Sequence, residues 1–281
     1  MRVIRSPAEL SDWAEVARGE NRRVGLVPTM GFLHRGHTSL MEASRARAAL
    51  TVVSIFVNPT QFGPNEDLAR YPRDLEGDLR KCREMQVDAV FAPEAGAMYP
   101  AGHRTFVEVT GLQDGLCGAR RPGHFRGVAT VVTQLFALAR PHLAVFGEKD
   151  WQQLQIIRRL AADLHLGVEV LGMPIVREAD GLAMSSRNAY LSAPERGRAL
   201  ALSRGLGAAR ARWAAGEREA DTLREAVRAE LRAGEVREDY VELVTPDTLE
   251  PLRRAERADA RLLVAAFVGN TRLIDNTAVG C

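Results

Sequence analysis

The sequence has few cysteines and none of the long apolar runs that mark membrane proteins. Its 281 residues include only three cysteines, Cys82, Cys117 and Cys281, and no two of them form a CxxC pair. An odd number of scattered cysteines indicates reduced thiols and a cytoplasmic location. No apolar run approaches the roughly 18 residues of a membrane span, and the first ten residues lack the apolar core of a signal peptide. We therefore expect no membrane partner.

The chain also lacks an excess of charge of one sign. Its 38 lysines and arginines face 36 aspartates and glutamates, for a net charge of +2. Proteins that hold nucleic acid by charge have a strongly basic surface, so we expect no nucleic-acid partner. A hydrophobic content of 46% and a charged content of 26% are typical of a globular enzyme. The length suffices for one large domain or two modest ones.

The most informative stretch is VGLVPTMGFLHRGH, which runs from Val24 to His37. It predicts a buried strand, a glycine-containing turn with two histidines, and a helix that starts near Thr38. This order presents backbone N–H groups and a helix N-terminus to an anion. Two imidazoles in the turn would add donors for a phosphate. Two histidines three residues apart also occur without function, so the meaning of the motif depends on the rest of the chain.

Strands and helices are predicted to alternate through the first 174 residues. The strands are continuous apolar runs, which favours burial on both faces and hence a parallel sheet. We therefore predict an α/β fold with a Rossmann-like, doubly wound sheet. Ligands bind at the carboxyl ends of such strands, where the HxGH turn and the turns at 58–61 and 147–150 all lie. The expected strands are 24–29, 51–57, 89–93, 105–109, 143–147 and 168–171, and the expected helices are 7–18, 38–49, 74–85, 128–139 and 151–164.

The pattern changes after Pro174. A hairpin is predicted around Asp180-Gly181, and a capping box at Ser192 to Glu195 opens a long helix. A second helix is expected at 221–233, followed by strands at 240–244, 261–268 and 271–275. We therefore expect a Rossmann-like domain over 1–174 and a smaller C-terminal α+β domain over 175–281.

Six segments stand out along nearly the whole chain. They are PTMGFLHRGH (28–37), FVNPTQF (56–62), RPGHFRGV (121–128), GEKDWQQ (147–153), ADGLAMSSRN (179–188) and RLIDN (272–276). In this order they resemble the pantothenate synthetase (pantoate–β-alanine ligase) family of the HxGH nucleotidyltransferase superfamily, which is related to class I aminoacyl-tRNA synthetases. The resemblance implies ATP-dependent condensation of pantoate with β-alanine through a pantoyl adenylate, with release of AMP and pyrophosphate.

The resemblance also implies roles for individual residues. Phosphate chemistry is expected of His34, His37, Lys149, Ser185, Ser186 and Arg187. Further ATP contacts are expected from Met30, Gly31, Phe32, Leu33, Arg35, Gly36, Gly147, Glu148, Asp150, Val176 and Met184. Pantoate is expected to contact Met30, Gln61 and Gln153, and β-alanine to contact Gln61, Arg121 and His124, with Asn58 behind them or beside the phosphates. Mg²⁺ is expected on the ATP phosphates without side-chain ligands. The family further implies a homodimer. Because the expected ATP ligands lie both before and after Pro174, we also expect the C-terminal domain to close over ATP as a lid.

Simpler interpretations exist for many of these residues. The two glutamines fit ordinary surface amides, and Ser185 to Arg187 fit a plain hairpin end. Arg121 and His124 fit a loop that caps the helix expected at Val128. We expect Asp74, Glu76 and Asp78 on a solvated helix face, not at a metal. His103, His142 and His165 are expected to be structural, and Cys117 has no neighbouring base that would make it a nucleophile.

Competing functions remain open at the level of sequence. Another HxGH enzyme would transfer a nucleotide to a phosphate instead of activating an acid. A tRNA synthetase relative would need an anticodon-binding extension and a basic surface. A non-catalytic nucleotide sensor would not need the full set of phosphate-binding groups.

Overall fold

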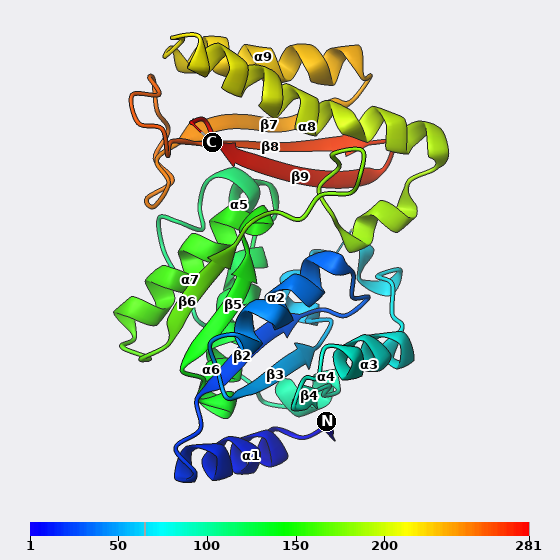
Figure 1. Ribbon diagram of the computed structural model, residues 1–281, viewed down its shortest axis with the longest axis vertical. Coiled ribbons are helices and arrows are strands. Elements are labelled where there is room, and N and C mark those ends of the chain that lie inside the picture. Colours follow the sequence, from blue (N-terminus) through cyan, green and yellow to red (C-terminus); the bar gives the residue numbers. More distant parts are fainter. Residues whose placement is uncertain (65, 281) are drawn as a thin grey trace. The chain divides into compact units, whose positions relative to one another are not determined.

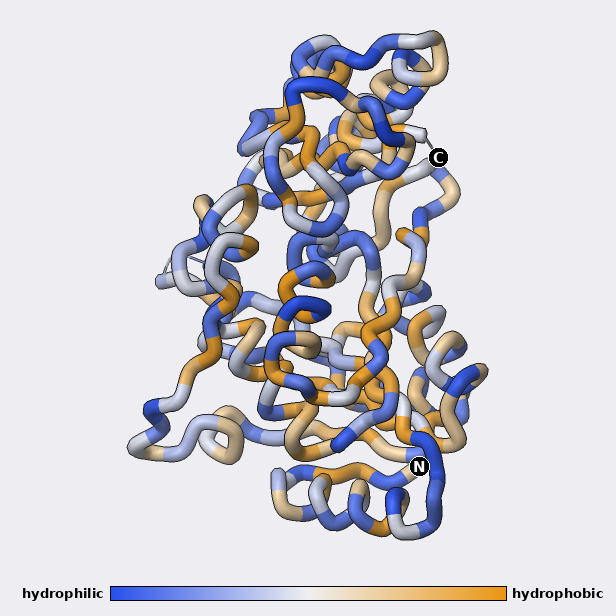
Figure 2. Tube along the Cα trace, turned by 90° about the vertical axis from the view of Figure 1, so that its left-hand side faces the viewer, coloured by the Kyte–Doolittle hydropathy of each residue, from blue (hydrophilic) through white to orange (hydrophobic). Residues whose placement is uncertain are grey.

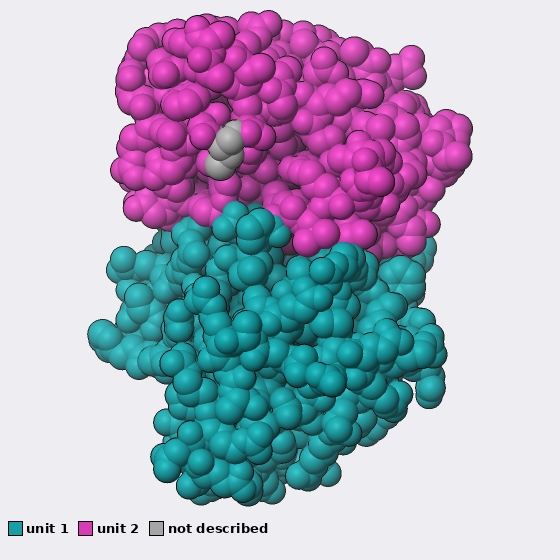
Figure 3. All heavy atoms as spheres, in the orientation of Figure 1, with its two compact units in different colours: residues 1–114, 118–148, 153–174 teal, residues 115–117, 149–152, 175–281 magenta. Residues whose placement is uncertain are grey.

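The chain divides into two units, shown in different colours in Figure 3. Unit 1 comprises residues 1–114, 118–148 and 153–174, and unit 2 comprises 115–117, 149–152 and everything from 175 onward. The structure is a computed structural model that describes residues 1–64 and 66–280. Cys281, one of the expected reduced thiols, lies outside the described residues, whereas Cys82 and Cys117 are free and buried. No described helix is long and apolar enough to cross a membrane.

A six-stranded parallel sheet forms the centre of unit 1, which confirms the predicted α/β fold (Figure 1). The order β1-β4-β3-β2-β5-β6 places β2 between β3 and β5. The winding direction reverses between β2 and β5, and ligands of such sheets bind at this switch point. The strands are β1 Arg2–Ile4, β2 Val24–Thr29, β3 Leu50–Ile55, β4 Ala89–Phe91, β5 Leu143–Gly147 and β6 Glu169–Met173.

Helices cover both faces of this sheet. Side chains of α2 and α3 pack with Val27, Val53 and Val145 in one core cluster. α1 and α6 pack on each other, and α6 also contacts β2. Figure 2 shows the hydrophobic stretches gathered in the interior of the trace. The helices are α1 Pro7–Gly19, α2 Arg35–Arg45, α3 Leu75–Glu84, α4 Ala95–Met98, α5 Leu116–Arg120, α6 His124–Ala139 and α7 Trp151–Asp163, with 3-10 turns η1 Pro59–Gln61, η2 Asp67–Ala69 and η3 Glu148–Asp150.

Three local predictions differ from the structure. Residues 105–109 were expected to form a strand, but the Val107 N–H instead donates to Thr130 Oγ1 on α6 (3.0 Å). Helix α2 begins at Arg35, earlier than expected, because the His34 side chain caps it. Helix α6 begins at His124, because Gly123 takes the left-handed conformation (φ 81°) as N-cap. Short β1 was not predicted at all.

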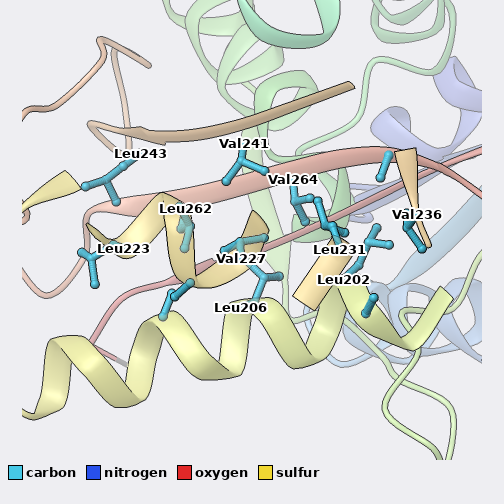
Figure 4. Packing of buried hydrophobic residues seen from close by; sticks show 14 of the residues in the cluster. Leu202, Leu206, Leu223, Val227, Leu231, Val236, Val241, Leu243, Leu262 and Val264 are labelled. Carbon is cyan, nitrogen blue, oxygen red and sulfur yellow. The ribbon is translucent and has the colours of Figure 1, made fainter. Parts of the chain in front are cut away.

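Unit 2 is built on a three-stranded antiparallel sheet in the order β7-β8-β9. Helices α8 and α9 pack on each other and on one face of this sheet (Figure 4). The predicted capping box at the start of α8 is confirmed, since the Ser192 N–H donates to Glu195 Oε2 (2.9 Å). The elements are η4 Ser186–Tyr190, α8 Ala193–Ala214, α9 Ala220–Ala233, β7 Arg237–Val244, β8 Arg261–Val268 and β9 Thr271–Ala278.

Two short segments from earlier in the chain pack on the strands of unit 2. The Trp151 indole N–H donates to the Pro246 carbonyl (2.7 Å), and the Arg261 guanidinium lies 3.3 Å from the centre of the Trp151 ring. The Cys117 N–H donates to Gln152 Oε1 (3.0 Å). These contacts explain why 115–117 and 149–152 belong to unit 2.

Candidate functional site

Two histidines cap the N-terminus of α2, at the carboxyl end of β2. His34 is the N-cap residue, and its Nδ1 accepts a hydrogen bond from the Gly36 N–H (3.1 Å). His37 sits three residues on, and its Nδ1 accepts from the His34 N–H (3.2 Å). The ring centres are 4.1 Å apart. The pair therefore forms a reciprocal capping box, a role more often filled by serine and glutamate.

These hydrogen bonds fix the tautomer of both rings. A backbone N–H can only donate, so each Nδ1 must carry a lone pair and each neutral ring carries its proton on Nε2. Both side chains thus present an N–H donor at Nε2 beside a helix N-terminus, where the helix dipole favours negative charge. The arrangement suits a phosphate.

A buried carboxylate holds the turn that leads to the histidines. Asp78 on α3 is 1% exposed and accepts from the Phe32 and Leu33 N–H groups, each at 2.7 Å. Burial raises the pKa of Asp78, and these two hydrogen bonds oppose that rise. A Cβ at Gly31, which has φ 82°, would lie 2.9 Å from Asp78 Oδ2. The expectation of a solvated Asp78 was wrong, because α3 turns this position inward.

The backbone of this turn borders a cavity of about 340 Å³ in unit 1. The cavity opens at the carboxyl ends of β2, β3 and β4, and Met30, Gly31 and Asp78 are among its lining residues. Leu33 itself is 4% exposed and belongs to the core, so only its backbone is placed to meet a ligand. The side chain of Arg35 lies along α2 and pairs with Glu42 (2.6 Å).

Buried amides occupy the turn after β3. Asn58 is 1% exposed, and its Nδ2 donates to Gln61 Oε1 (3.2 Å) and to the Gly127 carbonyl (3.1 Å). This orients the Gln61 amide so that its Nε2 points at Met30 Sδ, 2.9 Å away. Gln61 is 8% exposed, so the simple interpretation of a surface amide was wrong. A thioether is a weak acceptor, and a ligand oxygen would be a stronger one.

Arg121 and His124 hold this same turn from the start of α6. The His124 Nδ1–H donates to the Gln61 carbonyl (2.8 Å), and Arg121 NH1 donates to His124 Nε2 (3.0 Å). Arg121 also makes a two-point ion pair with Glu66, in which its Nε donates to Oε1 (2.8 Å) and its NH2 group donates to Oε2 (2.6 Å). Burial opposes ionisation of Glu66, but the hydrogen bond and charge of Arg121 prevail and lower the pKa of Glu66. Sequence reasoning missed Glu66, which lies outside the recognised motifs.

A second group of expected site residues lies within unit 2. The Met184 N–H donates to the Val176 carbonyl (3.0 Å), which closes the predicted hairpin. Ser185 caps η4, where its Oγ accepts from the Arg187 N–H (3.3 Å). Ser186 is 8% exposed.

Lys149 belongs to unit 2 although it follows the last residues of β5. Its side chain is 20% exposed and lies 3.9 Å from Asp150. Gln153, on α7 and half-buried, belongs to unit 1. Within 1–64 and 66–280, no cluster of three or more histidine, cysteine, aspartate or glutamate side chains could hold a metal ion by itself.

The sequence and the fold agree with one family of known proteins. A family model described as pantoate–beta-alanine ligase matches residues 2–278. The chain belongs to this family. The pantothenate synthetase of Myxococcus xanthus is 62% identical over 280 residues, which cover 99% of this chain and 96% of that relative. That of Anaeromyxobacter dehalogenans is 59% identical over 281 residues, which cover 98% of this chain and 97% of the relative.

Solved structures of the ligase family have the same fold. The pantothenate synthetase of Thermus thermophilus superposes with a TM-score of 0.94 at 49% identity, and 99% of each chain is covered. A pantoate–beta-alanine ligase from Francisella tularensis, complexed with beta-gamma ATP and beta-alanine, gives a TM-score of 0.83 at 28% identity over 100% of this chain and 98% of that one. The chain is therefore an enzyme of the ligase family with the full two-part fold.

Proposed function

We propose that this chain condenses pantoate with β-alanine in two steps that consume ATP. In the first step a pantoate carboxylate oxygen attacks the α-phosphorus, and the bond to the pyrophosphate leaving group breaks. In the second step the β-alanine nitrogen attacks the acyl carbon, AMP leaves with the electrons of the broken C–O bond, and the nitrogen loses its proton. Family membership supports this reaction, and the tRNA synthetase, nucleotidyltransferase and sensor alternatives have no comparable support.

The observation that carries the proposal is the histidine pair on α2. Its two Nε2–H donors and the helix N-terminus stand at the carboxyl end of β2, beside the switch point. Negative charge shifts between phosphate oxygens as the adenylate forms, and preorganised donors stabilise that charge most where it develops. His34 and His37 accordingly bind the phosphates, and Gly36 lets the nucleotide approach the backbone.

The remaining ATP contacts are proposed for residues 147–150, 176 and 184–187. Lys149 supplies a cation, and Asp150 with Gly147 and Glu148 meets the ribose side of the nucleotide. Val176 and Met184 border the adenine, and Ser185, Ser186 and Arg187 bind the β- and γ-phosphates. Mg²⁺ on the phosphates would neutralise part of their charge, and it suits this donor set because it keeps most of its waters and needs few carboxylates.

The pantoate site centres on Gln61 in unit 1. Its Nε2–H would exchange the Met30 sulfur for a pantoate oxygen, and the Met30 N–H would hold the carboxylate. Gln153 supplies the second amide for the two hydroxyls of pantoate. Arg121 and His124 guide β-alanine through the turn that they hold. The enzyme acts in the cytoplasm as a homodimer.

ATP–pyrophosphate exchange tests the proposal. Exchange should require pantoate and Mg²⁺ but not β-alanine, because the adenylate forms before the amine reacts. Small hydroxy acids other than pantoate serve as matched controls. Exchange that begins only after addition of β-alanine would contradict the adenylate. A phosphorylated product in place of AMP would favour a nucleotidyltransferase, and no ATP turnover with any acid would favour a sensor.

A further inference from the structure

The RLIDN segment, residues 272–276, has received no role in the reaction so far. It lies in β9, which is an edge strand of the sheet in unit 2. Successive residues of a strand point to opposite faces. Asp275 and Asn276 therefore reach in opposite directions from one place on this edge, and both are buried, at 3% and 2% exposure.

Asp275 holds the hairpin that leads into the serines. Its two carboxylate oxygens pair with Arg177, at 2.7 Å for NH1 and 2.9 Å for NH2. Arg177 NH1 also donates to the Gly181 carbonyl in the hairpin turn (3.1 Å). A two-point pair between guanidinium and carboxylate fixes direction as well as distance. The hairpin, and with it Ser185, is thereby tied to β9.

Asn276 holds the segment that bears Lys149. Its Nδ2–H donates to the Lys149 carbonyl oxygen (2.9 Å) across 127 residues of sequence. Because the bond is made to the main chain, it sets the point from which the Lys149 side chain starts. A small cavity of about 10 Å³ is lined by Lys149, Ser185 and Asp275 together. The two anchored segments therefore meet around this strand.

We infer that Asp275 and Asn276 are positioning residues for adenylate formation. Together they set the spacing between Lys149 and the segment Ser185 to Arg187. The inference rests on the proposed function, in which both segments bind the ATP phosphates. A displacement of about 1 Å in groups that position a reacting centre can lower the rate by up to about 10²-fold.

Asn276→Ala is the first test, with Thr277→Ala as the control one residue further along β9. In the exchange assay, Asn276→Ala should raise the KM for ATP by roughly tenfold and leave the KM for pantoate within twofold. Thr277 is half-buried and its hydroxyl donates to the Ala278 carbonyl next to it in the strand (3.0 Å), so Thr277→Ala should match the wild type.

Amine acylation followed by mass spectrometry gives a second measurement. The chain has two lysines, Lys81 and Lys149, so each site is easily resolved. ATP should protect Lys149 at least fivefold in the wild type and in Thr277→Ala, but less than twofold in Asn276→Ala. Lys81, on α3, should react equally in all three and serves as the internal reference.

Asp275→Asn and Arg177→Lys test the other side of the strand. Both should raise the KM for ATP and leave the acylation rate of Lys149 without ATP unchanged, because its own anchor persists. Arg177→Lys keeps the opposite charges and covers the case in which Asp275→Asn does not fold. Wild-type KM and protection in these variants, or an equal rise in KM for ATP and pantoate, would overturn the inference. Loss of pantoate dependence in the wild type would instead overturn the proposed function.

Discussion

Each histidine of the HxGH turn has two roles, because its ring has two different nitrogens. Nδ1 accepts a backbone N–H and caps α2, whereas Nε2 carries the proton that we propose is donated to a phosphate. A substitution can therefore remove one role and keep the other. Asparagine is a strong N-cap residue, and its short side chain cannot reach where the imidazole Nε2–H reaches.

We predict that His34→Asn keeps the stability of the chain within about 1 kcal/mol and lowers the adenylation rate by roughly 10²–10³, the usual loss on removal of one preorganised donor. His37→Ala should lower the rate at least as much. Thermal unfolding and pyrophosphate exchange check both statements. Wild-type turnover in His34→Asn would show that the capping role alone accounts for this histidine.

Asp78 is a residue whose importance only the structure reveals. Asp78→Asn keeps the shape but replaces one acceptor oxygen by an amide that opposes the Phe32 or Leu33 N–H. We predict a loss of about 1–3 kcal/mol in the free energy of unfolding and slower adenylation. Chemical denaturation measures the first and exchange the second. Glu76→Gln, on the same helix, is the control, and an equal effect there would refute the specific role.

His142 makes the stability of unit 1 depend on pH. Burial and the charges of Arg18 and Arg23 lower the pKa of His142 below its ordinary 6.5, and its Nδ1 accepts from the Val24 N–H (3.1 Å). As pH falls, the unfolded chain binds the proton first, so this contribution is complete above pH 6.5 and is lost below it. We predict a steeper fall in unfolding free energy between about pH 7 and pH 5 for the wild type than for His142→Asn. Parallel curves would contradict this.

The sequence motifs contain the groups proposed to contact a ligand, but not all of the groups that hold those residues in place. His34, His37 and Gln61 stand in contiguous motifs whose chemistry is visible in the letters. Asp78 binds Phe32 and Glu66 binds Arg121, which lie 46 and 55 residues away in the sequence. No local sequence pattern predicts such distant pairs. A carboxylate in a charged helix looks solvated until the helix is placed against the sheet.

At the level of elements, α6 and η1 pack so closely that a side chain does not fit between them. A Cβ at Gly127 would lie 2.5 Å from the Thr60 carbonyl carbon and 2.7 Å from the Gln61 nitrogen. The same glycine offers its carbonyl to Asn58 (3.1 Å). The position of Gln61 thus depends on the absence of a side chain at Gly127 on the neighbouring helix.

We predict that Gly127→Ala raises the KM for pantoate more than that for ATP, because it displaces the turn that carries Gln61. It should also destabilise the chain by about 1–3 kcal/mol, the range for overpacking. Gly197→Ala is the control, since nothing lies within 4 Å of its added Cβ in α8, and alanine there should stabilise by about 0.5–1 kcal/mol. Equal KM changes for both substrates would point to general damage.

Hydrophobic periodicity predicted the type of most helices and strands, but it did not predict the residues at which they begin and end. The strands at 24–29 and 143–147 match the prediction because continuous apolar runs have one interpretation in a parallel sheet. The starts of α2 and α6 were misplaced because a histidine and a left-handed glycine cap them. The segment 105–109 has the composition of a strand, but its backbone bonds to a side chain of α6.

At the level of the whole molecule, the residues proposed to bind ATP are divided between the units. His34 and His37 belong to unit 1, whereas Lys149 and Arg187 belong to unit 2. The sequence pattern places Lys149 with the first domain, because it directly follows an apolar strand. In the structure Lys149 belongs to unit 2, because Trp151 and Asn276 bind this segment to other parts of that unit.

We predict that ATP couples the motions of the two units. Charge-assisted contacts contribute about 1.5–3 kcal/mol each, enough to shift a hinge equilibrium of a few kcal/mol. ATP with Mg²⁺ should reduce the radius of gyration in solution scattering, and Arg187→Ala should weaken that response. Adenosine is the ligand control because it lacks phosphates. An identical scattering curve with and without ATP would reject the lid.

The bond from Asn276 to Lys149 also has a consequence for synthesis. After Lys149 the ribosome adds 127 residues to reach Asn276, which takes roughly 6 to 25 s at about 5–20 residues per second. Throughout that interval the nascent chain already contains the histidine turn and most strands of the unit 1 sheet, but not the strand that fixes its lysine. Under the positioning inferred above, Lys149 and the segment Ser185 to Arg187 do not reach their final spacing until β9 has been made and has paired with β8.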